Sequence, residues 1–102
     1  MNFLIKNNIE KIIELCKSHH VESLALFGSA AKNSMNTESD IDFLIHFSND
    51  LELLDYADNY FSLLDSLELI TGKKIDLISV NSLKNPVLID EINRSKINLY
   101  AA

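Results

Sequence analysis

The sequence predicts an α/β (α+β) fold, a small mixed β-sheet flanked by helices. Apolar residues recur at helical spacing across residues 2–19. Residues 40–47 alternate between apolar and polar side chains, which is the period of a β-strand. Further helix-like and strand-like segments alternate along a chain of 102 residues, which is long enough for one modest core. We therefore expect a single domain that covers residues 1–102.

The first part of the chain should form a helix, a buried strand and a second, brief helix. The apolar residues of the first helix are Ile5, Ile9, Ile12, Ile13 and Cys16. Residues 23–27 are apolar and stop at Gly28, as a short buried strand would. Residues 29–33 suit the brief helix, and the polar residues 34–39 suit a surface loop.

The strand at residues 40–47 should separate its side chains onto two faces. One face carries Ile41, Phe43, Ile45 and Phe47, and the other carries Asp40, Asp42, Leu44 and His46. Residues 74–80 are expected to form another strand, and residues 96–100 an edge strand. Between them, Asn85 and Pro86 should open a short helix with the proline at its first position.

A long helix is expected over residues 51–70. Ser48, Asn49 and Asp50 are its candidate N-caps, and Gly72 stands where a C-terminal stop belongs. The predicted apolar stripe of this helix consists of Leu53, Leu54, Ala57, Phe61, Leu64 and Leu67.

Composition limits the classes of function. The formal net charge is −6, with 15 acidic and 9 basic residues, whereas a domain that grips nucleic acid is normally basic. Nucleic acid is therefore not the expected substrate. Cys16 is the single cysteine and reads as a core residue, which leaves no disulfide framework. No stretch reaches the roughly 18 apolar residues of a membrane span, and no secretion signal opens the chain, so a cytoplasmic protein is expected.

Two features of the chain suit the binding of phosphate and metal. Gly28 and Ser29 follow a buried strand, where backbone N–H groups can bind anionic oxygens. Asp40 and Asp42 lie two residues apart in a strand, so their carboxylates share a face. Mg²⁺ prefers such oxygen ligands together with substrate phosphates. The alternative interpretations are an ordinary turn at Gly28 and a solvated strand end at Asp40.

Asp76 is the third feature. It interrupts an otherwise apolar strand, although an unpaired buried charge is costly. If this strand pairs with the strand at residues 40–47, all three carboxylates can meet. Alternatively, Asp76 faces water from an edge strand or pairs with Lys73 or Lys74.

The combined pattern of Gly28-Ser29, Asp40-x-Asp42 and Asp76 resembles the polymerase-beta-like nucleotidyltransferase superfamily. Two stretches look more narrowly like the minimal nucleotidyltransferase (MNT) group, the antitoxins of HEPN/MNT type. They are Leu26-Phe27-Gly28-Ser29-Ala30-Ala31-Lys32 and Ser39-Asp40-Ile41-Asp42-Phe43-Leu44-Ile45. The resemblance covers nearly the whole chain.

The resemblance implies an enzyme that transfers AMP from ATP to a hydroxyl. Asp40 and Asp42 would hold two Mg²⁺ ions, and Asp76 would bind the ion nearest the acceptor. The implied nucleotide-binding residues are Gly28, Ser29, Lys32 and Ser39. The acceptor oxygen would attack the α-phosphorus in line, and pyrophosphate would leave.

The chain also departs from the family pattern. Ala30 occupies a position where a basic residue is common, and Asn33 one where a second glycine often follows. The resemblance implies an antitoxin that adds AMP to a tyrosine of a HEPN-type RNase toxin, with which it could form an oligomer. Two alternatives remain: a binding module that neutralises its partner by docking alone, and transfer to a small molecule.

Overall fold

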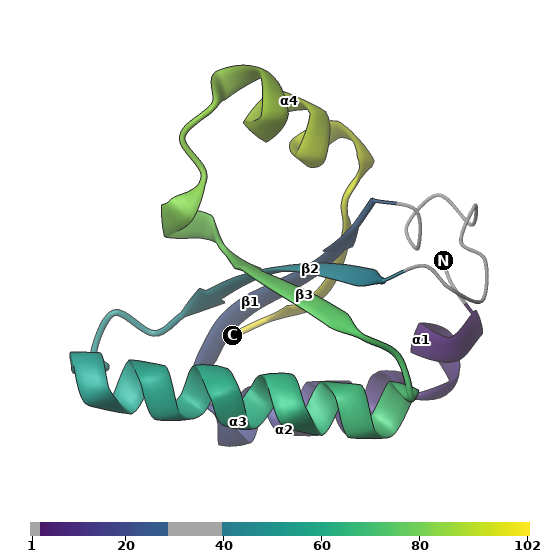
Figure 1. Cartoon of the computed structure of the whole chain (residues 1–102), viewed down its shortest axis with the longest axis vertical. Helices are drawn as coiled ribbons and strands as arrows, with labels where there is room; N and C mark the ends of the chain where they lie inside the picture. The colour runs from purple at the N-terminus through teal and green to yellow at the C-terminus, as the bar shows by residue number, and fades with distance from the viewer. Residues whose placement is uncertain (1–2, 29–39) are drawn as a thin grey trace.

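The computed structural model describes residues 3–28 and 40–102. Its centre is a four-stranded sheet in the order β3-β2-β1-β4 (Figure 1). The strands are β1 (Val21–Phe27), β2 (Ile41–Phe47), β3 (Ile75–Ser79) and β4 (Ile97–Ala101). β1 runs antiparallel to both β2 and β4, whereas β2 and β3 are parallel. The mixed sheet flanked by helices confirms the predicted fold class.

Helices lie on both faces of this sheet. They are α1 (Phe3–Asn7), α2 (Ile9–Ser18), α3 (Leu53–Thr71) and α4 (Pro86–Ser95), with a 3₁₀ turn, η1 (Val80–Ser82), after β3. Figure 1 shows α2 and α3 along one face and α4 on the other. The larger core lies under α1–α3, and a smaller cluster of Ala25, Leu44 and Ile92 lies under α4. Fewer apolar side chains therefore pack against the sheet face under α4 than against the face under α1–α3.

Several predicted elements are confirmed. Ile41, Phe43, Ile45 and Phe47 are all buried, as the alternation along β2 requires. Gly72 ends α3 in the left-handed conformation (φ +65°), and its N–H donates to the Glu68 carbonyl oxygen. β4 is an edge strand as predicted. The predicted brief helix at residues 29–33 and loop at residues 34–39 lie outside the described residues.

The first helix departs from the prediction of one continuous element. It divides at Asn8 into α1 and α2. The side-chain Nδ2 of Asn8 donates to the Leu4 carbonyl oxygen (2.8 Å), and its backbone N–H donates to the Ile5 carbonyl oxygen (3.1 Å). Asparagine competes in this way with the regular helical pattern. Cys16, in α2, is fully buried as predicted, and burial raises the pKa of its thiol to about 12.

The N-caps predicted for α3 and three residues of its predicted stripe are wrong, whereas Leu64 and Leu67 face the core as predicted. The helix begins at Leu53 after Glu52, with no side-chain cap, and Ser48 forms a separate turn in which its Oγ accepts from the Asp50 N–H (3.3 Å). Leu53, Leu54 and Phe61 are exposed. The residues that face the core are Tyr56, Tyr60, Leu63, Leu64 and Leu67.

Two tyrosines explain the rotation of α3. Tyr60 donates its hydroxyl to the Leu77 carbonyl oxygen (2.6 Å) on β3, and its ring stacks on Tyr56. Tyr56 also makes an edge contact with Phe47 (5.0 Å between ring centroids). The hydroxyl of a tyrosine packed against a core usually finds a hydrogen-bond partner, and β3 supplies one here. The spacing of apolar residues in the sequence does not indicate such a hydrogen bond.

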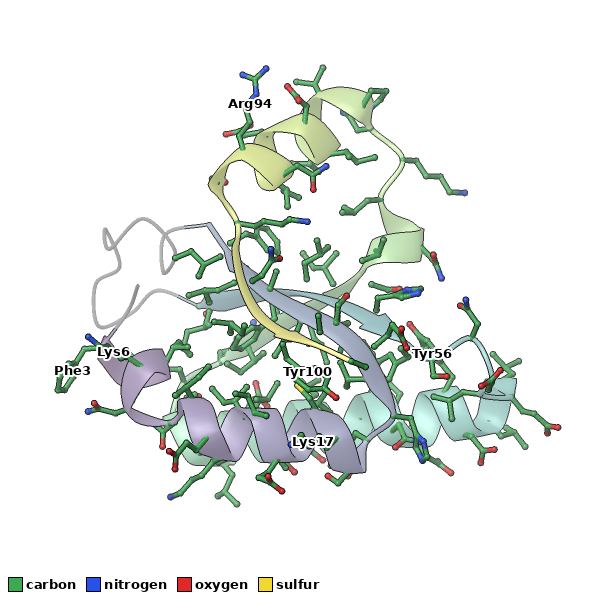
Figure 2. The ribbon with its side chains drawn as sticks, turned by 180° about the vertical axis from the view of Figure 1, so that it is seen from behind. Phe3, Lys6, Lys17, Tyr56, Arg94 and Tyr100 are labelled. Atoms are coloured by element: carbon green, nitrogen blue, oxygen red, sulfur yellow. The ribbon has the colours of Figure 1, made fainter. Side chains whose placement is uncertain are left out.

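The residues near the C-terminus belong to the core rather than to a free surface. Ile97, Leu99 and Tyr100 are partly buried and pack against the larger cluster. Figure 2 shows Tyr100 on the side of the sheet where α2 lies. Within the described ranges, none of the helices is long and apolar enough to cross a membrane.

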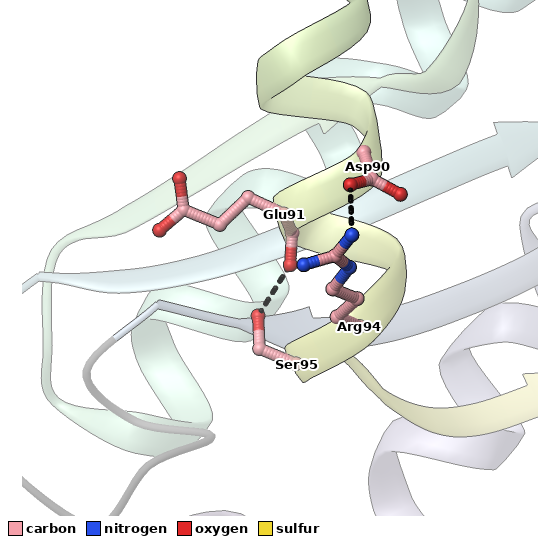
Figure 3. Close-up of polar contacts among 4 residues, drawn as sticks. All are labelled: Asp90, Glu91, Arg94 and Ser95. Carbon is pink, nitrogen blue, oxygen red and sulfur yellow. Dashed lines mark hydrogen bonds and ion pairs between the residues drawn. The ribbon is translucent and has the colours of Figure 1, made fainter.

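Asn85 caps α4 as predicted. Its Oδ1 accepts from the N–H groups of Val87 (3.0 Å) and Leu88 (3.4 Å). Later in the helix, Asp90 and Arg94 form an exposed ion pair (2.8 Å), and the Ser95 hydroxyl donates to the Glu91 carbonyl oxygen (Figure 3). Exposed pairs of this kind add little stability, so the cap is the stronger local determinant of α4.

We expect Asn85→Ala to lower the free energy of unfolding by about 1 kcal/mol, because two backbone N–H groups lose their acceptor. Urea denaturation followed by circular dichroism measures this. Asn93→Ala, an exposed change within the same helix, is the control and should be neutral or slightly stabilising. Equal losses in the two variants would contradict the role assigned to the cap.

Candidate active site

The parallel pairing of β2 and β3 brings two aspartates together. Asp42 and Asp76 are direct Cα partners across these strands. The register is extended by the Ile41 N–H, which donates to the Lys74 carbonyl oxygen (3.0 Å). Ile41 and Phe43 on β2, and their partners on β3, are buried under the helices, so the intervening aspartates face the opposite side. The alternation that builds the core therefore also sets the two carboxylates side by side.

The electrostatics of the pair reflect this proximity. Burial, then a hydrogen bond to Asp76 and the charge of Asp76, raise the pKa of Asp42 to about 6; the charge of Asp40 adds a smaller contribution. A hydrogen bond between two carboxyl groups requires a proton on one of them. Without a cation, the site therefore binds a proton more readily than an isolated aspartate does. Such a pair suits a divalent metal ion, which relieves the same repulsion.

Gly28 ends β1 directly against Asp42. The neighbouring Phe27 is the Cα partner of Asp42 in the antiparallel pairing. Gly28 has φ +72°, and a Cβ built at this position would lie 2.6 Å from the Asp42 Oδ2 atom. No real side chain tolerates so close a contact without displacement. The glycine therefore permits both a backbone conformation and a close approach to the carboxylate.

Asp40 is half-buried just before β2, and it is near enough to Asp42 to raise the pKa of that residue. Across residues 3–28 and 40–102, however, no three carboxylate, imidazole or thiol groups converge as a preformed metal site. The structure thus brings Asp42 and Asp76 together, with Asp40 as a neighbour. Ser29, Lys32 and Ser39, the other predicted nucleotide-binding residues, lie outside the described residues.

Two features beside the aspartates have no signal in the sequence. Tyr60 of α3 reaches the residue that follows Asp76, and the pKa of its hydroxyl is raised by burial and then by the charges of Tyr56 and Asp76. A small cavity of about 190 Å³ also adjoins Gly28. It is lined by Phe27, Gly28, Leu88, Glu91, Ile92 and Ser95. Both features depend on how α3 and α4 dock on the sheet, which local sequence patterns do not report.

His19 and His46 do not contribute to the group formed by Asp40, Asp42 and Asp76. His19 caps the end of α2, where its Nδ1 lies 2.7 Å from the Leu15 carbonyl oxygen and its Nε2 lies 2.9 Å from the Ser62 hydroxyl. Because a carbonyl oxygen can only accept, Nδ1 is the donor in the contact with Leu15. His46 lies on the same face of β2 as Asp42, but four residues further along the strand. Its Cα partner there is Ser23 of β1.

Comparison with known proteins agrees with this arrangement. The family described as "Polymerase beta, Nucleotidyltransferase" matches residues 10–102. "Putative protein adenylyltransferase MJ0128" of Methanocaldococcus jannaschii is 36% identical over 94 residues, which are 91% of this chain and 92% of that protein. These values establish a relationship over nearly the full length of both chains.

Solved structures share the fold. One described as "Structure of putative minimal nucleotidyltransferase" has 30% identity and a TM-score of 0.75, and the match covers 95% of each chain. Another, described as a tri-AMPylated Shewanella oneidensis HEPN toxin in complex with MNT antitoxin, has 21% identity and a TM-score of 0.64 over 95% of this chain and 72% of that one. The chain therefore belongs to the polymerase beta nucleotidyltransferase family, in its minimal form, and is an enzyme of the nucleotidyltransferase class.

Proposed function

We propose that this chain is a Mg²⁺-dependent protein adenylyltransferase that transfers AMP from ATP to a tyrosine hydroxyl of a HEPN-type toxin, and that it acts as the antitoxin of that toxin in the cytoplasm. The observation that carries the proposal is the pairing of Asp42 with Asp76 beside Gly28. Carboxylates that converge from two neighbouring strands supply the oxygen ligands that metal-assisted transfer at phosphorus requires.

Each residue has a distinct role in this proposal. Asp40 and Asp42 would hold the Mg²⁺ ions, expected to be two, and Asp76 would bind the ion that serves the acceptor hydroxyl. These ions would neutralise the triphosphate and lower the pKa of the acceptor hydroxyl. Gly28 leaves room beside Asp42 for the outer phosphates, with Ser29, Lys32 and Ser39 as further nucleotide-binding residues. The net charge of −6 disfavours binding of nucleic acid and of free ATP, so we expect the triphosphate to bind where metal ions neutralise its charge.

The reaction is a substitution at phosphorus. The acceptor oxygen bonds to the α-phosphorus of ATP, the bond from that phosphorus to the β-phosphate oxygen breaks, and pyrophosphate leaves. The hydroxyl proton passes to Asp76, which is exposed on the edge strand and accessible to a protein acceptor. The chain contributes mainly position and electrostatic stabilisation.

A protein acceptor suits what the names of the relatives say and the exposure of Asp76. The relative from Methanocaldococcus jannaschii carries the name of a protein adenylyltransferase, and the HEPN toxin of the solved complex is tri-AMPylated. Asp76 is exposed on the edge strand β3, where a folded protein can bring its own acceptor side chain.

A second candidate function is neutralisation by docking without transfer. The departures at Ala30 and Asn33 favour it, because they remove a basic residue and a glycine from the expected phosphate-binding segment. The close approach of Asp42 and Asp76 argues against it, because paired carboxylates destabilise a site that binds no cation.

Intact-mass spectrometry of the toxin after co-expression separates these two functions. We expect the toxin mass to rise by whole AMP units with the wild-type chain and to remain unchanged with Asp40→Ala/Asp42→Ala. Asp50→Ala/Asp90→Ala removes two exposed carboxylates elsewhere and is the matched control, which should modify the toxin fully. An unmodified toxin that is nevertheless bound and neutralised by the wild-type chain would establish the docking function instead.

A further inference from the structure

The outer edge of β3 is occupied by side chains of α3. β3 is the last strand on its side of the sheet, so every second residue turns its backbone N–H and carbonyl groups away from β2. The Lys74 carbonyl oxygen accepts from the Ile41 N–H of β2 and therefore points toward that strand. By the same alternation, the backbone groups of Asp76 point toward β2, and those of Ile75 and Leu77 point outward.

Two side chains of α3 bind these outward groups on either side of Asp76. The Glu68 Oε2 atom accepts from the Ile75 N–H (3.1 Å). The Tyr60 hydroxyl donates to the Leu77 carbonyl oxygen (2.6 Å). An unpaired strand edge otherwise offers such groups to water or to another strand. The residue before Asp76 and the residue after it are thus both held by α3.

Neither of these side chains faces the candidate active site. α3 and α4 lie on opposite faces of the sheet (Figure 1), and the side chains of Ile75 and Leu77 are buried on the face under α3. The carboxylate of Asp76 points to the other face, where Asp42 is its neighbour across the strands. Both side chains can therefore act on this carboxylate only through the backbone. Because β2 holds β3 from one side alone, the two hydrogen bonds from α3 fix it from the other.

We propose that Tyr60 and Glu68 are positioning residues of the candidate active site: they hold the backbone of β3 on both sides of Asp76 and so fix its carboxylate against Asp42. Removal of a group that orients a metal ligand commonly lowers metal affinity or activity by about tenfold or more. The role of Asp76 as a metal ligand rests on the proposed function. The two hydrogen bonds that hold its neighbours belong to the fold of the chain and do not depend on that function.

Titration of Mn²⁺ into the chain with a non-hydrolysable ATP analogue, followed by electron paramagnetic resonance, tests the proposal without any transfer step. Tyr60→Phe keeps the ring and removes only the hydroxyl, and Glu68→Ala removes the acceptor of the Ile75 N–H. Each variant should bind one of the two expected ions at least about tenfold more weakly, and the other within about twofold of wild type. A displaced Asp76 affects only the ion that it binds, whereas a loss of folded protein reduces the binding of both.

Initial rates of AMP transfer to the toxin provide a second measurement. Both variants should lower kcat at least about tenfold, whereas KM for ATP should stay within about threefold of wild type. The reason is that the proposed site binds the nucleotide mainly beside Gly28 and Asp42, while Asp76 serves the acceptor hydroxyl.

Matched variants separate positioning from a general effect on the helix. Tyr56→Phe removes a hydroxyl from the ring stacked on Tyr60; within residues 3–28 and 40–102 that hydroxyl makes no hydrogen bond, so metal binding and kcat should stay within about twofold of wild type. Asp65→Ala removes an exposed carboxylate from α3 and should be equally neutral. Glu68→Gln should recover most of the activity lost in Glu68→Ala, because its amide oxygen can accept from the same N–H.

Unchanged metal binding and kcat in both Tyr60→Phe and Glu68→Ala would overturn the proposal, and a single variant with wild-type values would remove its residue from this role. An equal loss of both ions would also overturn it, because that result assigns the two side chains to stability alone. If the wild-type chain binds two ions and the variants lose one, but no AMP reaches the toxin, the positioning of Asp76 stands and the proposed function fails. If the wild-type chain binds no ion, both claims fail.

Discussion

Asp42→Asn should reduce AMP transfer at least about a thousandfold, a loss of about 4 kcal/mol in transition-state stabilisation. Asp42 is the central carboxylate, since it is the Cα partner of Asp76 and also lies against Gly28. An asparagine keeps the shape of the side chain but cannot supply the second negative charge. Initial rates with radiolabelled ATP measure the effect. A variant that keeps more than a tenth of wild-type activity would contradict the assignment.

The same variant should be more stable than the wild-type chain when no metal is present. The raised pKa of Asp42 means that its ionisation opposes folding. Its contribution to stability is fully present below pH 4 and is lost as the pH rises through about 6. Asp42→Asn should therefore gain about 1 kcal/mol at pH 7.5, after allowance for solvent screening, and little at pH 4. Urea denaturation with a chelator present, against Asp50→Asn as control, measures the difference.

Gly28→Ala should impair both the stability and the activity of the chain. At φ +72° an alanine costs about 1 kcal/mol in backbone strain. Its Cβ would also lie 2.6 Å from the Asp42 Oδ2 atom and would push the carboxylate out of place. We expect at least about a hundredfold loss of AMP transfer, because small displacements of catalytic groups are costly.

Gly72 supplies a matched control for this change. It has nearly the same conformation, φ +65°, but no atom lies within 4 Å of the position of an added Cβ. Gly72→Ala should therefore lose about 1 kcal/mol of stability and keep wild-type activity. Denaturation and initial rates on both variants separate backbone strain from the contact with Asp42. Equal activities in the two alanine variants would show that this contact plays no part in the reaction.

The sequence predicted what depends on alternation and on single residues with distinctive conformations. β2 has period two, and the face predicted from Ile41, Phe43, Ile45 and Phe47 is buried, which puts Asp42 on the other face. Leu44 on that second face is buried as well, because Ile92 of α4 packs against it. Gly72 ends α3 in the left-handed conformation, and Asn85 caps the first N–H groups of α4. Each of these positions favours a particular residue type for a local reason, so the sequence indicates it. The meeting of Asp42 with Asp76 needed one further assumption, that their strands are neighbours, and the parallel pairing confirms it.

The sequence could not predict what depends on tertiary contacts. The side of α3 that faces the core is set by Tyr60, whose hydroxyl reaches a carbonyl oxygen seventeen residues away. The cavity beside Gly28 depends on where α4 docks. The break at Asn8 depends on one side-chain hydrogen bond that competes with helix formation. In each case the deciding partner is an atom that no local pattern specifies.

The most direct test of the account is a titration of Mn²⁺, a spectroscopic substitute for Mg²⁺, into the chain with a non-hydrolysable ATP analogue, followed by electron paramagnetic resonance. We expect two bound ions per wild-type chain, and loss of binding in Asp42→Asn and in Asp76→Asn. Tight binding of the analogue in the presence of a chelator, or unchanged Mn²⁺ binding by both variants, would contradict the claim that these carboxylates form the metal site.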